Sequence, residues 1–251
     1  MSPNNLSVHC GAVRTVEDVV AALGAIRDQA AEDLRAPEID GISCFTRLYT
    51  TITENILGTL NGSHPTRSFD DNAFLARLDV EFARRYLDAI VAHERDDDSV
   101  PGCWKVLFDR RRDQGVRHVN FAACGVNAHV NFDLTFALLA TWEDFPPTVG
   151  RRADYDRVND IFAEEMDDLR EDFQAFLAGT RDGGLLDRLG NAMSDLLVRQ
   201  TRGQAWEAAE RVWEHRGDDE AYRQALATET ERLDDAAHAL GRMILEAPGL
   251  P

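Results

Sequence analysis

Residues 118–142 read HVNFAACGVNAHVNFDLTFALLATW, and Asp133 is the only side chain among them that is certain to be charged at neutral pH. A surface helix of a globular protein normally presents a charged face to water. A helix without such a face is usually surrounded by protein, so we expect residues from about 117 to 141 to form the central helix of a bundle. The histidines, asparagines and Asp133 make the segment too polar to span a membrane.

The rest of the chain repeats apolar residues at helical spacing on both sides of this segment. A capping box at Thr15 and Asp18 begins the first predicted helix. We expect a second helix at about 42–60, a third from a cap at Ser68 and Asp71 to about 94, and a short one around Trp104. Three or four more helices are expected between 154 and 246. The sequence therefore predicts an all-α fold, a single domain over residues 15–247 with eight or nine helices, preceded by a tail at 1–14. Pro146-Pro147 could mark a boundary, but one buried helix needs both halves of the chain to cover it.

Charge and cysteine content restrict the class of protein. The chain has 251 residues and carries 45 acidic against 27 basic side chains, so we expect no nucleic-acid partner. Lys105 is the only lysine, a bias that either a GC-rich genome or a salt-rich cytoplasm would explain. There is no signal-peptide pattern and no run of about 20 apolar residues. The four scattered cysteines are typical of reduced thiols, so we expect a cytoplasmic protein. The oligomeric state is not predicted.

His129 and Asp133 are four residues apart and therefore share one face of the central helix. Gly125, one turn earlier on that face, leaves room for another backbone or for a ligand. Asp79 interrupts the apolar stripe of the third predicted helix, and a buried carboxylate needs a partner or a proton. We predict that His129, Asp133 and Asp79 are catalytic, and that the same three side chains are candidate ligands of a divalent metal ion.

Other polar side chains lie on or beside apolar stripes and are candidates for binding a small or lipid-like molecule. An arginine on a buried face could neutralise a buried carboxylate or the anion of a substrate. The five predicted binding residues are Tyr49, Thr53, Asn127, Asn159 and Arg202.

The competing interpretation is a non-catalytic binding or structural module with a purely architectural polar network. In that network Asp133 accepts a hydrogen bond from His129, and Asp79 accepts one from Tyr49, Asn159 or an arginine. A cavity that reaches His129 would favour the enzyme, and close packing around His129 would favour the module.

Five groups of residues together resemble the DUF5995 family, whose function is unknown and whose members come largely from high-GC bacteria and haloarchaea. The resemblance extends from Phe45 to Trp206 and implies a single all-helical domain with a shared buried site at Asp79, His129 and Asp133, without naming a reaction. The matching groups are Phe45-x-x-Leu48-Tyr49-x-x-x-Thr53, Leu78-Asp79-x-x-Phe82-Ala83, Asn127-Ala128-His129-Val130-Asn131-x-Asp133-Leu134, Asp154-Tyr155-x-x-Val158-Asn159 and Arg202-x-x-Ala205-Trp206.

Asn159-Asp160-x-x-Ala163-x-x-x-Asp167 is similar to the second magnesium motif of terpene cyclases. The similarity is incomplete, because Ala163 replaces the hydroxyl residue of that motif and Asp167 replaces its glutamate. An isoprenoid cyclase-like lyase is therefore a further alternative.

Overall fold

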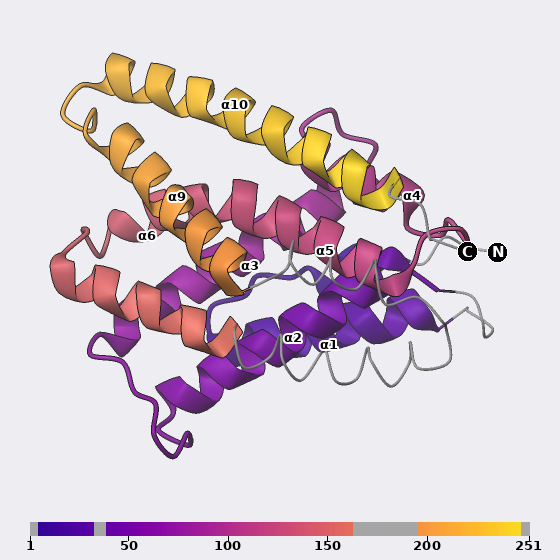
Figure 1. Cartoon of the computed structure of the whole chain (residues 1–251), viewed down its shortest axis with the longest axis horizontal. Coiled ribbons are helices and arrows are strands. Elements are labelled where there is room, and N and C mark those ends of the chain that lie inside the picture. The colour runs from indigo at the N-terminus through magenta and orange to yellow at the C-terminus, as the bar shows by residue number, and fades with distance from the viewer. Residues whose placement is uncertain (1–4, 33–38, 163–194, 247–251) are drawn as a thin grey trace.

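The computed structural model describes residues 5–32, 39–162 and 195–246, and within these ranges every regular element is a helix (Figure 1). The predicted all-α fold is confirmed. Residues 149–162 are also helical, while the parts of predicted helices that fall at 163–194 lie outside the described residues. The elements with their bounds are a 3₁₀ turn η1 (Leu6–His9), α1 (Val16–Ala31), α2 (Gly41–Leu60), α3 (Asn72–Glu94), α4 (Gly102–Arg110), α5 (His118–Ala128), the π-turn η2 (His129–Asp133), α6 (Leu134–Trp142), α9 (Asp195–Trp213) and α10 (Asp219–Glu246).

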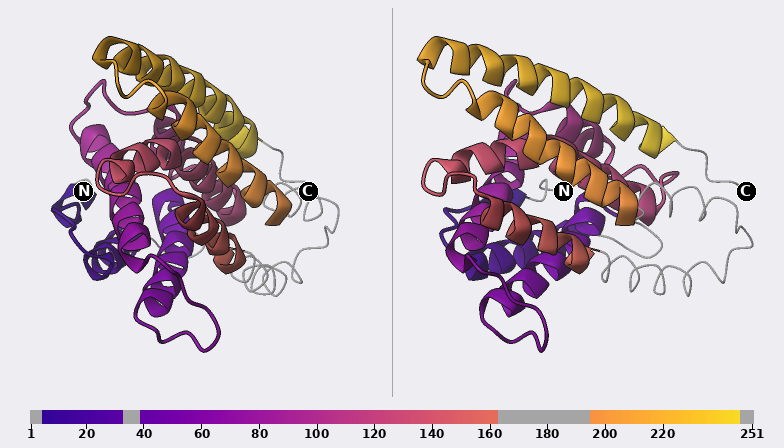
Figure 2. Two further views of the ribbon diagram at one scale, coloured as in Figure 1. Left: turned by 90° about the vertical axis from the view of Figure 1, so that its left-hand side faces the viewer. Right: turned by 60° about the vertical axis from the view of Figure 1, so that its left-hand side comes forward.

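The segment α5–η2–α6 is the predicted central helix, and it runs through the middle of the bundle. No residue between His118 and Trp142 is exposed. Helix α2 packs on one side of α5 and α10 on the other, while α3 and α9 cover α6. Both views of Figure 2 keep α9 and α10 on one side of this segment and α1 and α2 on the other. None of the described helices combines the length and apolarity needed to cross a membrane.

Helices α1, α2 and α3 bury the apolar stripes that their sequences predict. The capping box forms at the start of α1, where Thr15 and Asp18 exchange side-chain and backbone hydrogen bonds. The stripes of α2 and α3 are buried throughout, and Leu6 of the N-terminal turn is fully buried as well. The buried stripe residues of α2 and α3 include Phe45, Leu48, Tyr49, Ile52, Ile56, Leu75, Leu78, Phe82, Tyr86, Ala89 and Ile90.

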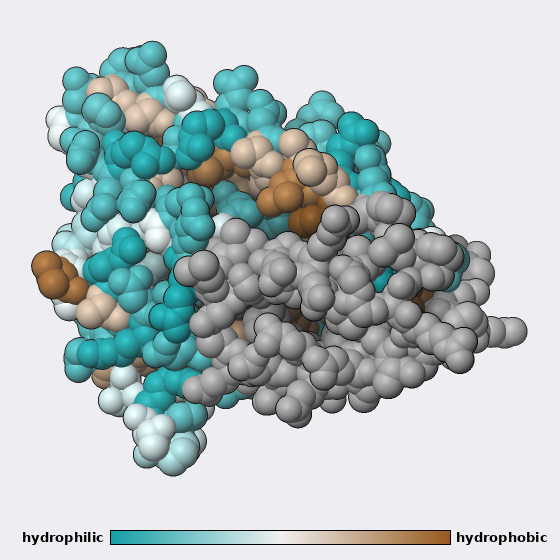
Figure 3. All heavy atoms as spheres, viewed as in Figure 1, coloured by the Kyte–Doolittle hydropathy of each residue, from teal (hydrophilic) through white to brown (hydrophobic). Residues whose placement is uncertain are grey.

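Two asparagines of α5 fix α10 against the central helix. The Asn120 Nδ2 atom donates to the carbonyl of Ile244, and the Asn127 Nδ2 atom donates to that of Ala237, each at 2.7 Å. In Figure 3 hydrophilic residues cover most of the side of α10 that is turned to the viewer. Two large apolar residues of this helix, Leu240 and Met243, are exposed. The face of the central helix that carries Asn120 and Asn127 therefore binds α10.

A buried carboxylate holds the helix at 149–162 against the start of α3. Asp154 accepts hydrogen bonds from the backbone N–H groups of Asp70 at 3.0 Å and Asp71 at 2.7 Å, and it pairs with Arg157 at 2.6 Å. Because these bonds fix the helix, they also fix Val158 and Phe162, which line the site described below.

Candidate functional site

The turn that carries His129 and Asp133 departs from α-helical geometry. The N–H group of Leu134 bonds to the carbonyl of His129, five residues earlier, so that residues 129–133 form one π-turn inside an otherwise regular helix. Such turns are rare and occur frequently at functional sites. The two side chains that the sequence singles out therefore lie on the one irregular turn of the central helix.

His129 and Asp133 form the predicted pair, and Trp104 completes it. The Asp133 Oδ2 atom lies 2.9 Å from His129 Nδ1 and 2.9 Å from Trp104 Nε1. The indole N–H can only donate, so Oδ2 is an acceptor, and His129 donates to it through Nδ1–H. The other carboxylate oxygen lies 3.5 Å from Arg85 Nε. This arrangement leaves the Nε2 atom of a neutral His129 as a free lone pair.

Aromatic rings surround the imidazole of His129. The ring stacks on Phe82 with centroids 3.4 Å apart and an interplanar angle of 7°, and it meets the Tyr49 ring edge-on at 4.5 Å. Burial lowers the pKa of His129 and prevails over Asp133, whose hydrogen bond and charge favour protonation. The ring is therefore neutral at pH 7, and its Nε2 atom is buried without a hydrogen-bond partner among the described residues.

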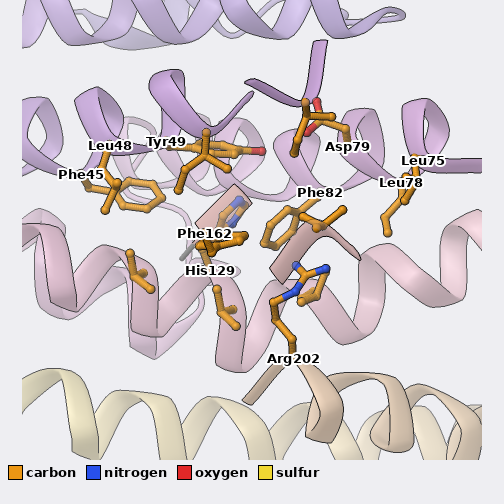
Figure 4. A pocket seen from close by; sticks show the side chains of 16 residues that line it. Phe45, Leu48, Tyr49, Leu75, Leu78, Asp79, Phe82, His129, Phe162 and Arg202 are labelled. Atoms are coloured by element: carbon orange, nitrogen blue, oxygen red, sulfur yellow. The ribbon is translucent and has the colours of Figure 1, made fainter. Parts of the chain in front are cut away.

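His129 forms part of the wall of a cavity, hereafter the central cavity, enclosed by α2, α3, the α5–α6 segment, residues 149–162 and α9 (Figure 4). The volume of the cavity is about 40 Å³. Four lining residues are polar, namely Tyr49, Asp79, His129 and Arg202. The remaining lining residues are Phe45, Leu48, Ile52, Ile56, Leu75, Leu78, Phe82, Val126, Val130, Leu134, Val158 and Phe162.

The polar residues of the central cavity present atoms with no partner among the described residues: the Tyr49 hydroxyl, Asp79 Oδ2, His129 Nε2 and Arg202 Nε. Figure 4 shows the hydroxyl end of the Tyr49 ring on the side of Asp79. Burial raises the pKa of Asp79 to about 7. Burial, reinforced by the charges of Asp79 and Asp133, raises the pKa of Tyr49 well above its ordinary value.

The structure brings together four of the predicted site residues at the cavity, with Asp133 behind its wall, and places the other three elsewhere. Thr53 donates to the carbonyl of Tyr49 at 2.9 Å, which is a local bond within α2. Asn127 is occupied on the opposite face, where it also accepts from Asn131 at 2.9 Å. Asn159 is buried with an unpartnered Oδ1 atom, yet it does not line the cavity. The predicted binding roles of these three residues gain no support from their positions.

The predicted metal site does not form. Across residues 5–32, 39–162 and 195–246, no three His, Cys, Asp or Glu side chains are placed to hold a metal ion. His129 Nδ1 and Asp133 Oδ2 bond to each other, and Asp79 lines the cavity while Asp133 does not. The residues therefore do not fit a metal centre. Of the cyclase-like motif, Asp160 is half exposed and pairs with Arg199 at 2.8 Å. Ala163 and Asp167 lie outside the described residues, so the motif stays a prediction.

The space beside Gly125 has an occupant that the sequence does not indicate. A Cβ atom at this position would overlap the ring of Phe45. The glycine therefore admits a side chain from α2, rather than a backbone or a ligand.

Three residues around the pair are missing from the sequence-based prediction. Trp104 and Phe82 read as ordinary apolar residues of their helices, since nothing in their spacing marks one as a hydrogen-bond donor to Asp133 or the other as the stacking partner of His129. Arg85 lies beside Phe136, with its guanidinium carbon 4.9 Å from the ring centroid, and near Asp133. These are cross-helix contacts, which a pattern within one helix does not predict.

A sequence model of a family of unknown function, DUF5995, matches residues 16–247. No curated protein and no solved structure gives a match.

Proposed function

The chain belongs to the family of unknown function DUF5995, and from the central cavity we propose that it catalyses proton transfer on a small, largely apolar carbonyl compound. In this proposal His129 is the base, and Tyr49 and Asp79 donate hydrogen bonds to the carbonyl oxygen. The observation that supports it is that these three residues line the same, mainly apolar cavity, each with a buried polar atom that has no partner among the described residues. Pockets with few, converging polar groups are typical of small-molecule sites.

His129 has the features of a general base. Its ring is neutral, its free lone pair is at Nε2, and its orientation is fixed by the Nδ1–H bond to Asp133. A carboxylate in this position sets the tautomer and stabilises the imidazolium that forms when Nε2 accepts a proton. The proton comes from a carbon next to the carbonyl: the C–H bond breaks, an N–H bond forms, and the electron pair moves to the carbonyl oxygen.

Tyr49 and Asp79 have the features of donors to that oxygen. With a pKa of about 7, the Asp79 carboxyl is protonated in about half of the molecules at neutral pH. The raised pKa of Tyr49 keeps its hydroxyl protonated. A neutral carboxylic acid beside a tyrosine hydroxyl is a known arrangement for stabilising the oxygen of an enolate.

The small volume of the central cavity, about 40 Å³, favours a short ligand over a long-chain lipid. The architectural alternative explains Asp133, which bonds to both His129 and Trp104. It leaves three buried polar atoms of Tyr49, Asp79 and His129 unpaired, and each such atom costs about 1–3 kcal/mol unless water or a ligand bonds to it. The ligand-binding interpretation accounts for all three.

Deuterium incorporation from D₂O into 2-pentanone tests the proposal, because each proton removed next to the carbonyl is replaced by a deuteron. Mass spectrometry of the recovered ketone should show exchange faster than in buffer, and His129→Gln should reduce it to the buffer rate. The matched control is His118→Gln, a histidine on the same central helix that does not line the cavity. Exchange at the buffer rate with the wild-type protein, or equal exchange with His129→Gln, would refute the base.

A further inference from the structure

Arg202 is a buried cation whose surroundings differ from those of the other buried charges. The residue is 3 % exposed, and its Nη2 atom donates to the carbonyl of Tyr155 at 2.9 Å. Its guanidinium carbon lies 4.2 Å from the centroid of the Tyr155 ring and 5.4 Å from that of Phe162. These contacts attach α9 to the helix at 149–162, but they include no carboxylate.

Two other buried charges of this bundle are paired directly. Asp40 is bonded to Arg111 at 2.7 Å, and Asp154 is bonded to Arg157 at 2.6 Å. Within the described part of the chain, no carboxylate oxygen forms an ion pair with Arg202, and no group forms a hydrogen bond with its buried Nε atom.

Asp79, the carboxylate that lines the central cavity, is not the counterion of Arg202. In Figure 4, Asp79 on α3 and Arg202 on α9 approach the central cavity from opposite sides. The pKa of Asp79 is raised by burial with no contribution from Arg202. The pKa of Arg202 is lowered chiefly by burial; the charge of Asp156, which pairs with Arg152 at 3.0 Å, opposes this shift without reversing it, and Asp79 contributes nothing. A buried charge without a counterion is strongly unfavourable. Arg202 lines the central cavity, so a negatively charged group of a bound ligand would be a suitable counterion for its guanidinium.

We propose that Arg202 binds a carboxylate group of the ligand through Nε–H, so that the substrate is a short oxo acid. This inference rests on the proposed function for the position of the oxo group, at Tyr49, Asp79 and His129. The oxo acid spans the cavity, with its carboxylate on the α9 side and its carbonyl on the α3 side. Its intervening carbon atoms lie against the apolar lining. A guanidinium is well suited to a planar carboxylate because its N–H donors have a fixed geometry.

The test compares binding of 4-oxopentanoate, 2-pentanone and the neutral amide 4-oxopentanamide by isothermal titration calorimetry. The wild-type protein should bind the oxo acid at least tenfold more tightly than either neutral compound, a comparison that needs no variant. Arg202→Gln should remove this preference while binding of the ketone remains. Arg199→Gln is the control, since Arg199 lies one turn earlier on α9 and is half exposed. Equal binding of the three compounds by the wild-type protein would overturn the inference.

The two proposals fail separately. If the oxo acid is preferred and Arg202→Gln removes the preference, but no compound exchanges deuterium, the carboxylate site stands and the base does not. If 2-pentanone exchanges deuterium at a rate that depends on His129 and the oxo acid is not preferred, the base stands and the carboxylate site does not. His129→Gln should retain the preference for the oxo acid, because it leaves Arg202 in place; loss of the preference in this folded variant would count against Arg202 as its source.

Discussion

Replacing Asp79 by asparagine should change how the free energy of unfolding depends on pH. Burial raises the pKa of this carboxyl from its ordinary value of 3.8 to about 7 in the folded protein. Below pH 3.8 the group is protonated in both the folded and the unfolded chain, and its contribution to stability is fully present. Between pH 4 and 7 the unfolded chain releases the proton while the folded protein retains it, so that stability falls as pH rises.

The size of this effect follows from the difference in pKa. At about 1.4 kcal/mol for each unit, a change from 3.8 to about 7 corresponds to roughly 4 kcal/mol. Asparagine has nearly the same shape and does not ionise. Asp79→Asn should therefore gain stability relative to wild type by roughly this amount between pH 4 and pH 8, with most of the gain below pH 7.

Urea denaturation followed by circular dichroism at several pH values between 4 and 8 measures this difference directly. Asp235→Asn, an exposed aspartate on α10, serves as the control and should follow the wild-type curve closely. A constant difference between Asp79→Asn and wild type across this range would refute the reasoning. It would mean that Asp79 ionises as it does in water, and that it does not lie in an apolar cavity.

Four further results are expected. His129→Ala and Asp133→Ala should be non-additive by about 1 kcal/mol or more in a double-mutant cycle, because each removes the other's hydrogen-bond partner; additive effects would show that the 2.9 Å contact contributes nothing. Because burial lowers the pKa of His129, the stability contributed by its neutral ring should be fully present above pH 6.5 and should decrease as pH falls through the lowered value; ¹⁵N signals that already report an imidazolium at pH 6.5 would contradict this. Gly125→Ala should cost about 1–3 kcal/mol and lower the Tm, since its Cβ would overlap the Phe45 ring; a Tm equal to that of wild type would mean that the ring does not fill this space. With a net charge of -18, the protein should show a rising Tm between dilute buffer and molar potassium chloride, and a flat or falling curve would contradict the role of self-repulsion.

The central helix could be predicted from sequence because a buried helix contains few charged residues. Twenty-five residues with one certain charge offer no charged face to water, and none of them is exposed in the structure. The capping box at Thr15 and Asp18 is similarly local, because it depends only on residues three positions apart. Features that depend on residues within one helix can therefore be predicted from the sequence.

The candidate site could be predicted only in part, for the same reason. The His129–Asp133 bond is a contact within one turn, and Asp79 is conspicuous as a charge in an apolar stripe. The bond from Trp104 to Asp133 joins two helices, and so does the stacking of Phe82 on His129. Neither contact changes the spacing of apolar residues along a helix, so that spacing does not predict it. Helical spacing also cannot separate a polar side chain that lines a cavity from one that bonds its own backbone.

Because helical spacing does not show which polar side chains line a cavity, the prediction includes three binding residues that do not line it. The hydroxyl of Thr53 bonds to the carbonyl one turn earlier, and the amide of Asn127 bonds to α10. Asn159 lies next to a lining residue, Val158, but does not line the cavity itself. Each lies on a helix that borders the cavity, but none of the three is among the residues that line it.

The π-turn at His129–Asp133 also has a bearing on how such a site can originate. A turn of this kind differs from regular helix by one additional residue, while the helix before it and the helix after it keep their ordinary geometry. The insertion of a single codon into a buried helix is therefore sufficient to produce it. An ancestral bundle could acquire the local irregularity around this histidine in one genetic step, without redesign of the helices that enclose it.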